Sequence, residues 1–199
     1  MGKNFLKSVM GGVMIAIGAS AYLSCDNKYI GAFLFAFGLF SICALSFGLY
    51  TGKVGYVFIK KQGFYKEVLI TLLANSAAVI LCGVIMSKVN SDIALKAEAM
   101  CEIKAEIPFF SAAVKAFMCG VLMFVAVHVY NEKNDAAKYI GIFTAVPVFI
   151  ISGYEHSVAN MFYFSLANMF DMHIAAFILV CVLANAVGAW TVATVWKIK

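Results

Sequence analysis

The chain has 199 residues, of which 64% are hydrophobic and only 13% are charged, and its mean hydropathy is +0.94. Soluble domains are about half apolar and about one quarter charged, so this composition indicates an integral membrane protein and leaves no room for a soluble domain. The net charge of +5 comes from lysine alone, and the lysines fall in loops and at segment ends, which argues against a nucleic-acid-binding surface.

Six apolar segments account for nearly the whole chain. A helical crossing of the hydrocarbon core needs about 20 residues. The segments lie at about residues 5–24, 29–59, 66–87, 109–130, 138–170 and 173–196. The sequence therefore predicts an all-α polytopic membrane protein, folded as a single transmembrane domain over residues 1–199.

Loop charges predict the orientation of these segments. One face of the membrane receives Lys3, Lys60, Lys61, Lys66, Lys133, Lys138, Lys197 and Lys199, and the other receives Lys28, Lys88, Lys96 and Lys104. By the positive-inside rule, we expect both termini in the cytoplasm and the protein in the cell (inner) membrane. The 88–108 connection then lies outside as a solvated loop.

The second and fifth segments are too long for a single crossing. At 1.5 Å per residue, each would form a helix of roughly 46–50 Å, against a core about 30 Å thick. We expect both to break. The second offers "GLYTGKVG" at residues 48–55, which contains three glycines, and the fifth offers the stretch just after Gly153.

An internal repeat explains why two segments are interrupted. "KYIGAF" at residues 28–33 recurs as "KYIGIF" at 138–143, and "LAN" at 73–75 recurs at 183–185. Each copy, at about 5–87 and 109–196, holds three crossings, so the second must insert upside down relative to the first. Interrupted segments at corresponding places of inverted repeats point to a transport site near the membrane midplane.

The stretch "SGYEHSVANMF" at residues 152–162 places three polar side chains inside an apolar segment. Ionisable residues at such a depth usually face a protein interior or a pathway. We expect His156 to line a pore, Glu155 to brace the loop rather than contact the substrate, and Asn160 to cap the helix that restarts here. Asn75 and Asn185 are expected to tie helices together.

Other candidate residues carry weaker signals. Lys53, beside Thr51, either tunes anion attraction from the cytoplasmic side or is simply solvated. The cysteines form no C-x-x-C pair, so no metal site, redox motif or cofactor is predicted. Cys25 and Cys101 fall in loops on the same predicted face, where a disulfide is an alternative to two free thiols.

These motifs resemble those of the formate/nitrite transporter family from about Val9 to Trp196. "SGYEHSVANMF" is similar to the family's fifth-helix motif, "LYTG" at 49–52 to its second-helix loop, and "CGVLMFVAV" from Cys119, less closely, to its fourth-helix motif. The chain is thus identified as a short, divergent member. The resemblance implies an aquaporin-like protomer in a homopentamer, each with a pore for small monovalent anions such as formate, nitrite, hydrosulfide or lactate.

The resemblance also implies roles for individual residues. His156 matches the central pore histidine, Thr51 the threonine opposite it, and Lys104 a vestibule lysine that attracts the anion. Apolar constrictions are implied at Phe35, Leu39 and Phe149 on the external side and at Leu49 and Tyr50 on the internal side. Gly48 replaces an acidic residue of the family pattern, and Gly120 replaces an asparagine.

An energetic comparison suggests the transport mechanism. Moving a bare anion through apolar constrictions costs on the order of tens of kcal/mol, whereas protonating a carboxylate of pKa near 4 at pH 7 costs about 4 kcal/mol. We therefore expect the anion, with a proton, to cross as the neutral acid. The alternative is an aquaporin-like channel for a neutral solute, although no Asn-Pro-Ala motif is present. An enzyme is not expected, because neither a cofactor motif nor a nucleophile with its base is found.

Overall fold

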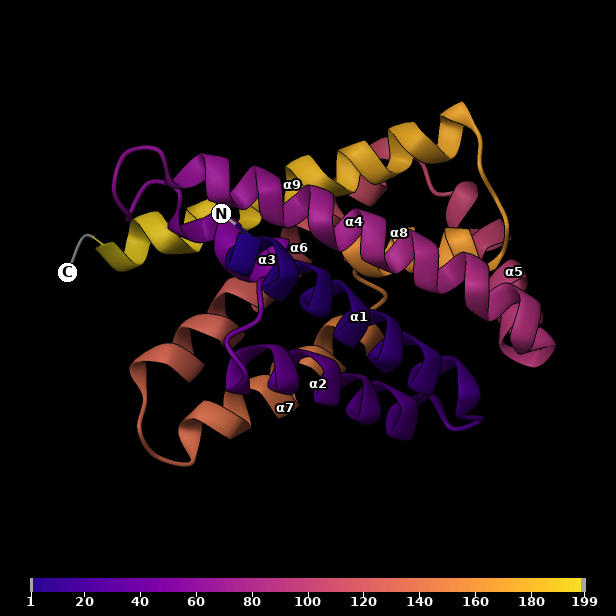
Figure 1. The fold of residues 1–199 in the computed structure, drawn as a ribbon, viewed down its shortest axis with the longest axis horizontal. Coiled ribbons are helices and arrows are strands. Elements are labelled where there is room, and N and C mark those ends of the chain that lie inside the picture. Colours follow the sequence, from indigo (N-terminus) through magenta and orange to yellow (C-terminus); the bar gives the residue numbers. More distant parts are fainter. Residues whose placement is uncertain (1, 198–199) are drawn as a thin grey trace.

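The computed structural model describes residues 2–197. The regular secondary structure within this range is entirely helical, with no strand. The helices are α1 (Gly2–Ser24), α2 (Lys28–Ala44), α3 (Tyr50–Lys53), the short 3-10 helix η1 (Val54–Tyr56), α4 (Phe64–Val89), α5 (Ser91–Ala105), α6 (Phe109–Glu132), α7 (Ala137–Ile151), α8 (Ser157–Leu166) and α9 (Met172–Lys197). The long helices run side by side along one axis, and α5 lies at one end of the bundle (Figure 1).

Four helices are long and apolar enough to cross a membrane, namely α1, α4, α6 and α9. The other two expected crossings are divided. The second stops at Ala44 and restarts at Tyr50, and the fifth stops at Ile151 and restarts at Ser157. The fifth breaks where the sequence predicted. The first break begins earlier than expected, at residues 45–49, and much of "GLYTGKVG" is helical.

Both breaks begin with the same helix-ending turn. At the end of α2, Ser46 has a positive φ of 54° and the Phe47 N–H donates to the Ile42 carbonyl at 2.9 Å. At the end of α7, Gly153 has a φ of 66° and the Tyr154 N–H donates to the Phe149 carbonyl at 2.9 Å. In each turn, a residue of left-handed conformation is followed by an N–H that bonds to the carbonyl five residues earlier, and this combination terminates a helix.

Close helix packing brings the breaks together in the bundle centre. α1 packs on α2 and α4, α6 packs on α7 and α9, and α2 packs on α7. Glycines permit this approach: a Cβ on Gly12 of α1 would lie 2.8 Å from the Asn75 carbonyl oxygen, and one on Gly120 of α6 would lie 2.1 Å from the Asn185 carbonyl oxygen. Gly12 and Gly120 occupy the same position in two similar stretches of the repeat, "KSVMGGV" at 7–13 and "KAFMCGV" at 115–121.

The 88–108 connection differs from a simple solvated loop, since it contains helix α5. The Asn90 side chain caps α5 by accepting the Ile93 N–H at 3.2 Å, and Ile93, Ala97 and Cys101 are buried against the bundle. Packing of this apolar face explains why the segment is ordered. All six cysteines are free thiols in the structure, so the alternative disulfide between Cys25 and Cys101 is not formed.

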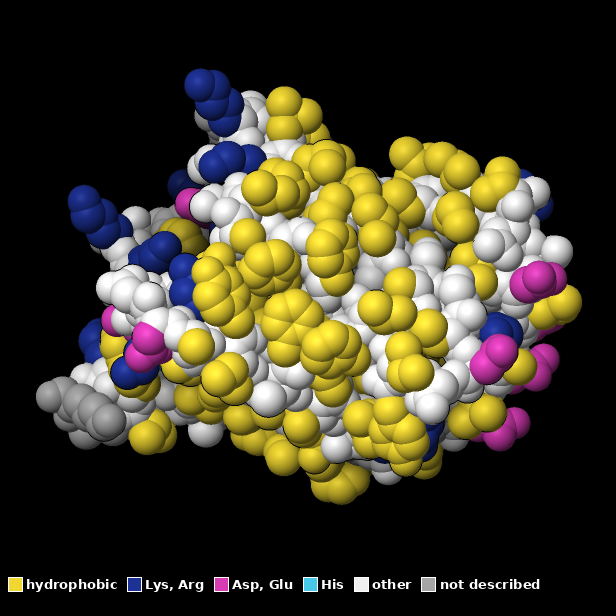
Figure 2. All heavy atoms as spheres, turned by 90° about the horizontal axis from the view of Figure 1, so that it is seen from below, with side chains coloured by type: hydrophobic (Ala, Val, Ile, Leu, Met, Phe, Trp, Pro, Cys, Tyr) yellow, Lys and Arg dark blue, Asp and Glu magenta, His cyan; other side chains and the backbone are white. Residues whose placement is uncertain are grey.

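The molecular surface is divided into zones along the long axis. In Figure 2, apolar side chains cover the middle of the visible face, whereas charged side chains gather at the two ends. Lysines dominate the end opposite α5, and acidic side chains gather at the α5 end. Such an apolar band between charged ends suits a bundle embedded in a bilayer.

Candidate functional site

Two cavities enter the bundle from opposite sides of the breaks. The first, here the α5 cavity, has a volume of about 240 Å³, and its wall includes Lys104, Lys115, Phe149, Glu155 and His156. The second, here the η1 cavity, has a volume of about 500 Å³.

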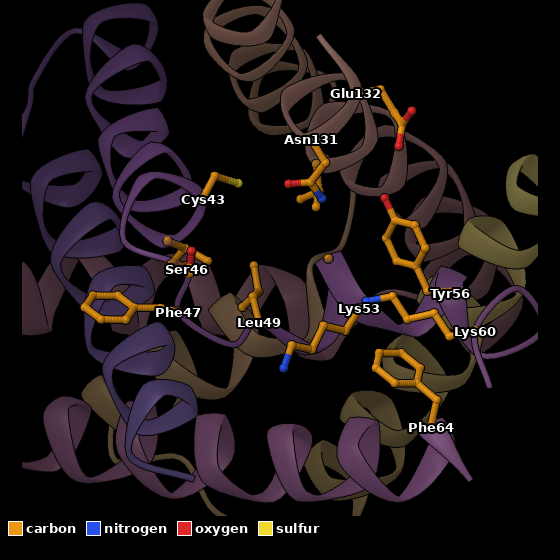
Figure 3. Close-up of a pocket in the computed structure, with 13 residues that line it drawn as sticks. Cys43, Ser46, Phe47, Leu49, Lys53, Tyr56, Lys60, Phe64, Asn131 and Glu132 are labelled. Carbon is orange, nitrogen blue, oxygen red and sulfur yellow. The ribbon is translucent and has the colours of Figure 1, made fainter. Parts of the chain in front are cut away.

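Figure 3 shows the η1 cavity, whose wall includes Leu49, Lys53, Tyr56, Lys60 and Glu132. The Lys53 ammonium lies 2.7 Å from a Glu67 carboxylate oxygen, so its charge is locally balanced. The Lys60 side chain projects over the Tyr56 and Phe64 rings. Lys53 therefore lies on the wall of a cavity, as expected for a residue that attracts anions, but its ammonium is paired with the Glu67 carboxylate.

The centre of the site is a contact between Thr51 of α3 and His156 at the start of α8. The Thr51 hydroxyl oxygen lies 2.9 Å from His156 Nε2, and the two side chains are 0% and 2% exposed. The His156 ring also stacks on Phe149 with ring centroids 5.7 Å apart. Thr51 and His156, which the sequence predicts at two separate breaks, thus meet in the structure.

The local geometry fixes the roles of the His156 nitrogens. His156 is the N-cap of α8, and its Nδ1 accepts the Ala159 N–H at 3.1 Å. An accepting nitrogen carries no proton, so in the neutral imidazole the proton lies on Nε2, which donates to Thr51. The Thr51 hydroxyl hydrogen is then left to donate to another acceptor.

Glu155 lies beside His156 in a buried ion pair. Its Oε2 lies 2.5 Å from the Lys104 ammonium and accepts a hydrogen bond from Asn160 Nδ2 at 2.9 Å. The expectation that Asn160 caps α8 is wrong, because its side chain is directed to Glu155 and the His156 imidazole provides the cap. The expected bracing of the loop by Glu155 is consistent with these contacts.

Two buried asparagines hold the broken backbone in the same way. Asn75 Oδ1 accepts the Tyr50 N–H at 2.8 Å, while its Nδ2 donates to the Ser8 and Gly48 carbonyls at 2.6 and 2.9 Å. Asn185 Oδ1 accepts the Ser157 N–H at 2.9 Å, while its Nδ2 donates to the Ala116 and Glu155 carbonyls at 2.7 and 2.9 Å. Each asparagine satisfies backbone groups that the breaks release, as expected for residues that tie helices together.

The five residues expected at constrictions are all buried. Phe35 and Phe149 meet edge to face with ring centroids 5.7 Å apart. Leu39 is 1% exposed and lies one turn after Phe35 on α2. Leu49 lines the η1 cavity, and the Tyr50 hydroxyl donates to the Val182 carbonyl of α9 at 2.9 Å.

Some residues at the cavities carry no sequence motif. Tyr22, Tyr154 and Tyr163 line the α5 cavity, and nothing in their spacing distinguishes them from membrane-facing aromatics. For Lys115, about two helical turns after the start of the fourth apolar segment, the sequence favours a pore lysine and a snorkelling or subunit-interface lysine equally, and the structure places the residue on the wall of this cavity. Within residues 2–197, no group of three or more His, Cys, Asp or Glu side chains is arranged to hold a metal ion.

Comparisons with known proteins agree on one family. The family model described as formate/nitrite transporter matches residues 1–198. Nitrite transporter NirC of Escherichia coli (strain K12) is 37% identical over 76 residues, which are 38% of this chain and 28% of NirC. Formate channel FocB of the same organism is 25% identical over 181 residues, with 79% of this chain and 64% of FocB covered. The matches thus span less than two thirds of each relative.

Solved structures share the fold. A structure described as a pentameric formate channel with formate bound has a TM-score of 0.81 and 20% identity, covering 98% of this chain and 95% of that chain. Another, described as an FNT family ion channel, has a TM-score of 0.85 and 20% identity, covering 98% of this chain and 89% of that chain. At this identity the likeness establishes the fold.

Proposed function

The chain belongs to the formate/nitrite transporter family, and from this membership we propose that it conducts a small monovalent weak-acid anion, of the formate, nitrite or hydrosulfide class, across the cell membrane. The family and the relatives are transporters and channels rather than enzymes. The observation that carries the proposal is the buried Thr51–His156 contact, which lies between two cavities that open from opposite ends of the bundle.

The proposed channel domain has six crossings arranged as two inverted repeats, at about 5–87 and 109–196. Matching contacts support this arrangement. The Gly48 N–H donates to the Lys7 carbonyl at 3.1 Å, and the Glu155 N–H donates to the Lys115 carbonyl at 3.4 Å. The helix-ending turns at Ser46 and Gly153 also match, and so do the backbone hydrogen bonds made by the side chains of Asn75 and Asn185. All these pairs have nearly the same offset in sequence.

The proposed orientation places both termini in the cytoplasm and α5, within the 88–108 connection, outside. The lysine-rich end of the molecule is the end opposite α5 (Figures 1 and 2), as the positive-inside rule requires of a cytoplasmic face. We further propose a homopentamer in the bilayer, supported by the pentameric state named for one structure of the same fold. The α5 cavity is then the external vestibule and the η1 cavity the internal one.

The proposed mechanism transfers the anion as its neutral acid. Phe35, Leu39 and Phe149 form the external constriction, and Leu49 and Tyr50 form the internal one; all five are buried. An anion would lose its hydration there, whereas the neutral acid needs only a hydrogen-bond partner. Thr51 supplies that partner, because its hydroxyl hydrogen is not used by His156 in the tautomer given by the helix cap.

The same geometry favours water over His156 as the proton source. With Nδ1 occupied by the Ala159 N–H, neutral His156 has only its Nε2 proton, and releasing it would leave an imidazolate. We therefore propose that the anion takes its proton from water in the external vestibule and that His156 orients Thr51. The proton leaves to water in the internal vestibule.

Uptake of labelled formate, nitrite and hydrosulfide into proteoliposomes, measured across a pH series, tests this function. For an acid of pKa near 4, each unit fall in pH raises the neutral fraction about tenfold above that pKa, so flux is expected to rise as external pH falls. Empty liposomes provide the background from lipid permeation. Flux of glycerol or water without flux of any of the three anions would instead support the neutral-solute alternative and refute the proposal.

A further inference from the structure

The α5 cavity contains one positive charge without a partner. Its wall includes Lys104, Lys115 and Glu155, and no other Asp, Glu, Lys or Arg. The Lys104 ammonium lies 2.5 Å from the Glu155 carboxylate, so these two charges balance each other. Within residues 2–197, Lys115 forms no ion pair and its ammonium makes no hydrogen bond to the protein.

Lys104 is not free to bind an anion, because its ammonium is already paired with Glu155. Its side chain is 14% exposed and that of Glu155 is 2% exposed, and Glu155 is held in place by Asn160. An anion that paired with Lys104 would have to displace a buried carboxylate, which would be left without a cation. A mobile monovalent anion competes poorly with a fixed carboxylate at this distance.

The position of Lys115 suits contact with an entering anion. Its backbone carbonyl accepts the Glu155 N–H, and the next carbonyl, of Ala116, is held by Asn185, so this turn of α6 is fixed beside the loop that carries His156. Helix side chains lean towards the helix N-terminus. Since α6 begins next to α5, the Lys115 side chain leans towards the cavity that it lines.

We propose that Lys115 is the residue whose ammonium binds the transported anion in the α5 cavity, and that Lys104 is a positioning residue that holds Glu155. This inference rests on the proposed function and refines it, because the family resemblance assigns anion attraction to Lys104. The ligand class is a small monovalent anion, whose single charge matches the single unpartnered ammonium. The binding site lies next to Phe149 and His156, at the entrance to the external constriction.

Concentration-dependent uptake of labelled formate, nitrite and hydrosulfide into proteoliposomes tests the assignment. Replacing Lys115→Met keeps the aliphatic stem and removes the charge, and we expect the KM for the anion to rise about tenfold, the effect of losing one charge-assisted hydrogen bond. Lys115→Arg keeps the charge and should hold the KM within about twofold of wild type. Lys88→Met is the matched control and should leave the KM unchanged, because Lys88 is exposed in the last turn of α4 and forms no ion pair within residues 2–197.

The outcomes separate this inference from the proposed function. A wild-type protein that carries none of formate, nitrite and hydrosulfide refutes both. A wild-type protein that carries any of the three, with an unchanged KM for that anion in Lys115→Met, refutes only the role of Lys115. If Lys115→Met does not elute as a folded protein in detergent, Lys115→Gln, which keeps a polar end, is judged by the same change in KM.

Discussion

The Thr51 hydroxyl oxygen and His156 Nε2 lie 2.9 Å apart although the residues are 105 positions apart in sequence. The η1 cavity reaches Leu49 and Gly52 on one side of this contact, and the α5 cavity reaches Phe149 and His156 on the other. The contact is therefore a buried polar pair that lies between the two cavities.

Removing the Thr51 hydroxyl should block transport between the cavities while preserving the fold. Thr51→Val has nearly the same shape, but it leaves His156 Nε2 and the passing acid without a partner, so anion flux should fall at least tenfold. Thr51→Ser retains the hydroxyl and should keep most of the flux. Proteoliposome uptake at equal protein content measures both variants. Equal flux in Thr51→Val and wild type would remove Thr51 from the pathway.

His156 combines two functions that substitutions can separate. Asn is a good N-cap, so His156→Asn should preserve the start of α8, but its short side chain does not reach Thr51. We expect a folded protein with strongly reduced flux, whereas His156→Ala should lose both flux and part of the stability, about 1 kcal/mol for the lost cap. Uptake and thermal unfolding in detergent are measured together. A His156→Ala protein with wild-type rate and pH dependence would contradict the central-histidine assignment.

Asn185 should contribute strongly to stability. Its side chain satisfies the Ser157 N–H and the Ala116 and Glu155 carbonyls, and it is 0% exposed. Asn185→Ala leaves these backbone groups without partners inside the bundle, so the free energy of unfolding should fall by about 3 kcal/mol. Asn134→Ala, at an exposed loop position, is the control. An unfolding midpoint equal in both variants would argue that the hydrogen bonds of the Asn185 side chain do not stabilise the protein.

Several of these features were accessible from the sequence. The lengths of the second and fifth apolar segments require a break, because a straight helix of either length would exceed the hydrocarbon core. The family motifs identified His156 and Thr51, and the repeat identified Asn75 and Asn185 as a matched pair. Side-chain directions were not accessible. The sequence suggests Asn160 as a cap by residue type, but its amide bonds to Glu155 because His156 already occupies the capping position.

Pairings between distant segments were equally hidden. Nothing in the sequence indicates that Lys104 of α5 meets Glu155 across 51 positions, or that Lys53 meets Glu67. The helix within 88–108 was missed because its charged residues suggested a solvated loop, whereas its buried stripe is only Ile93, Ala97 and Cys101. A helix that buries so few apolar residues can be recognised only when the surface against which it packs is known.

Gly120 should be required for the approach of α6 to α9. A Cβ there would lie 2.1 Å from the Asn185 carbonyl oxygen, a backbone atom that cannot move without shifting α9. Gly120→Ala should therefore lower the unfolding temperature in detergent, despite the higher helix propensity of alanine. In Gly141→Ala the new Cβ would meet only Val129 side-chain carbons, at 3.1 and 3.3 Å, so this control should be tolerated. Equal unfolding temperatures of the two variants would contradict the tight packing.

The Lys104–Glu155 pair should show strong energetic coupling. Glu155→Gln leaves a largely buried ammonium without its carboxylate, and Lys104→Met leaves a buried carboxylate with only Asn160, so each single change should destabilise the protein by several kcal/mol. The double variant contains no unpaired charge and should be more stable than the sum of the single effects predicts, with a coupling energy of about 2 kcal/mol. The same cycle on Lys96 and Asp26, whose side chains are 45% and 99% exposed, should show no measurable coupling. Additive effects at Lys104 and Glu155, measured by unfolding in detergent, would mean that the two charges do not balance each other and would leave Lys104 free to attract the anion.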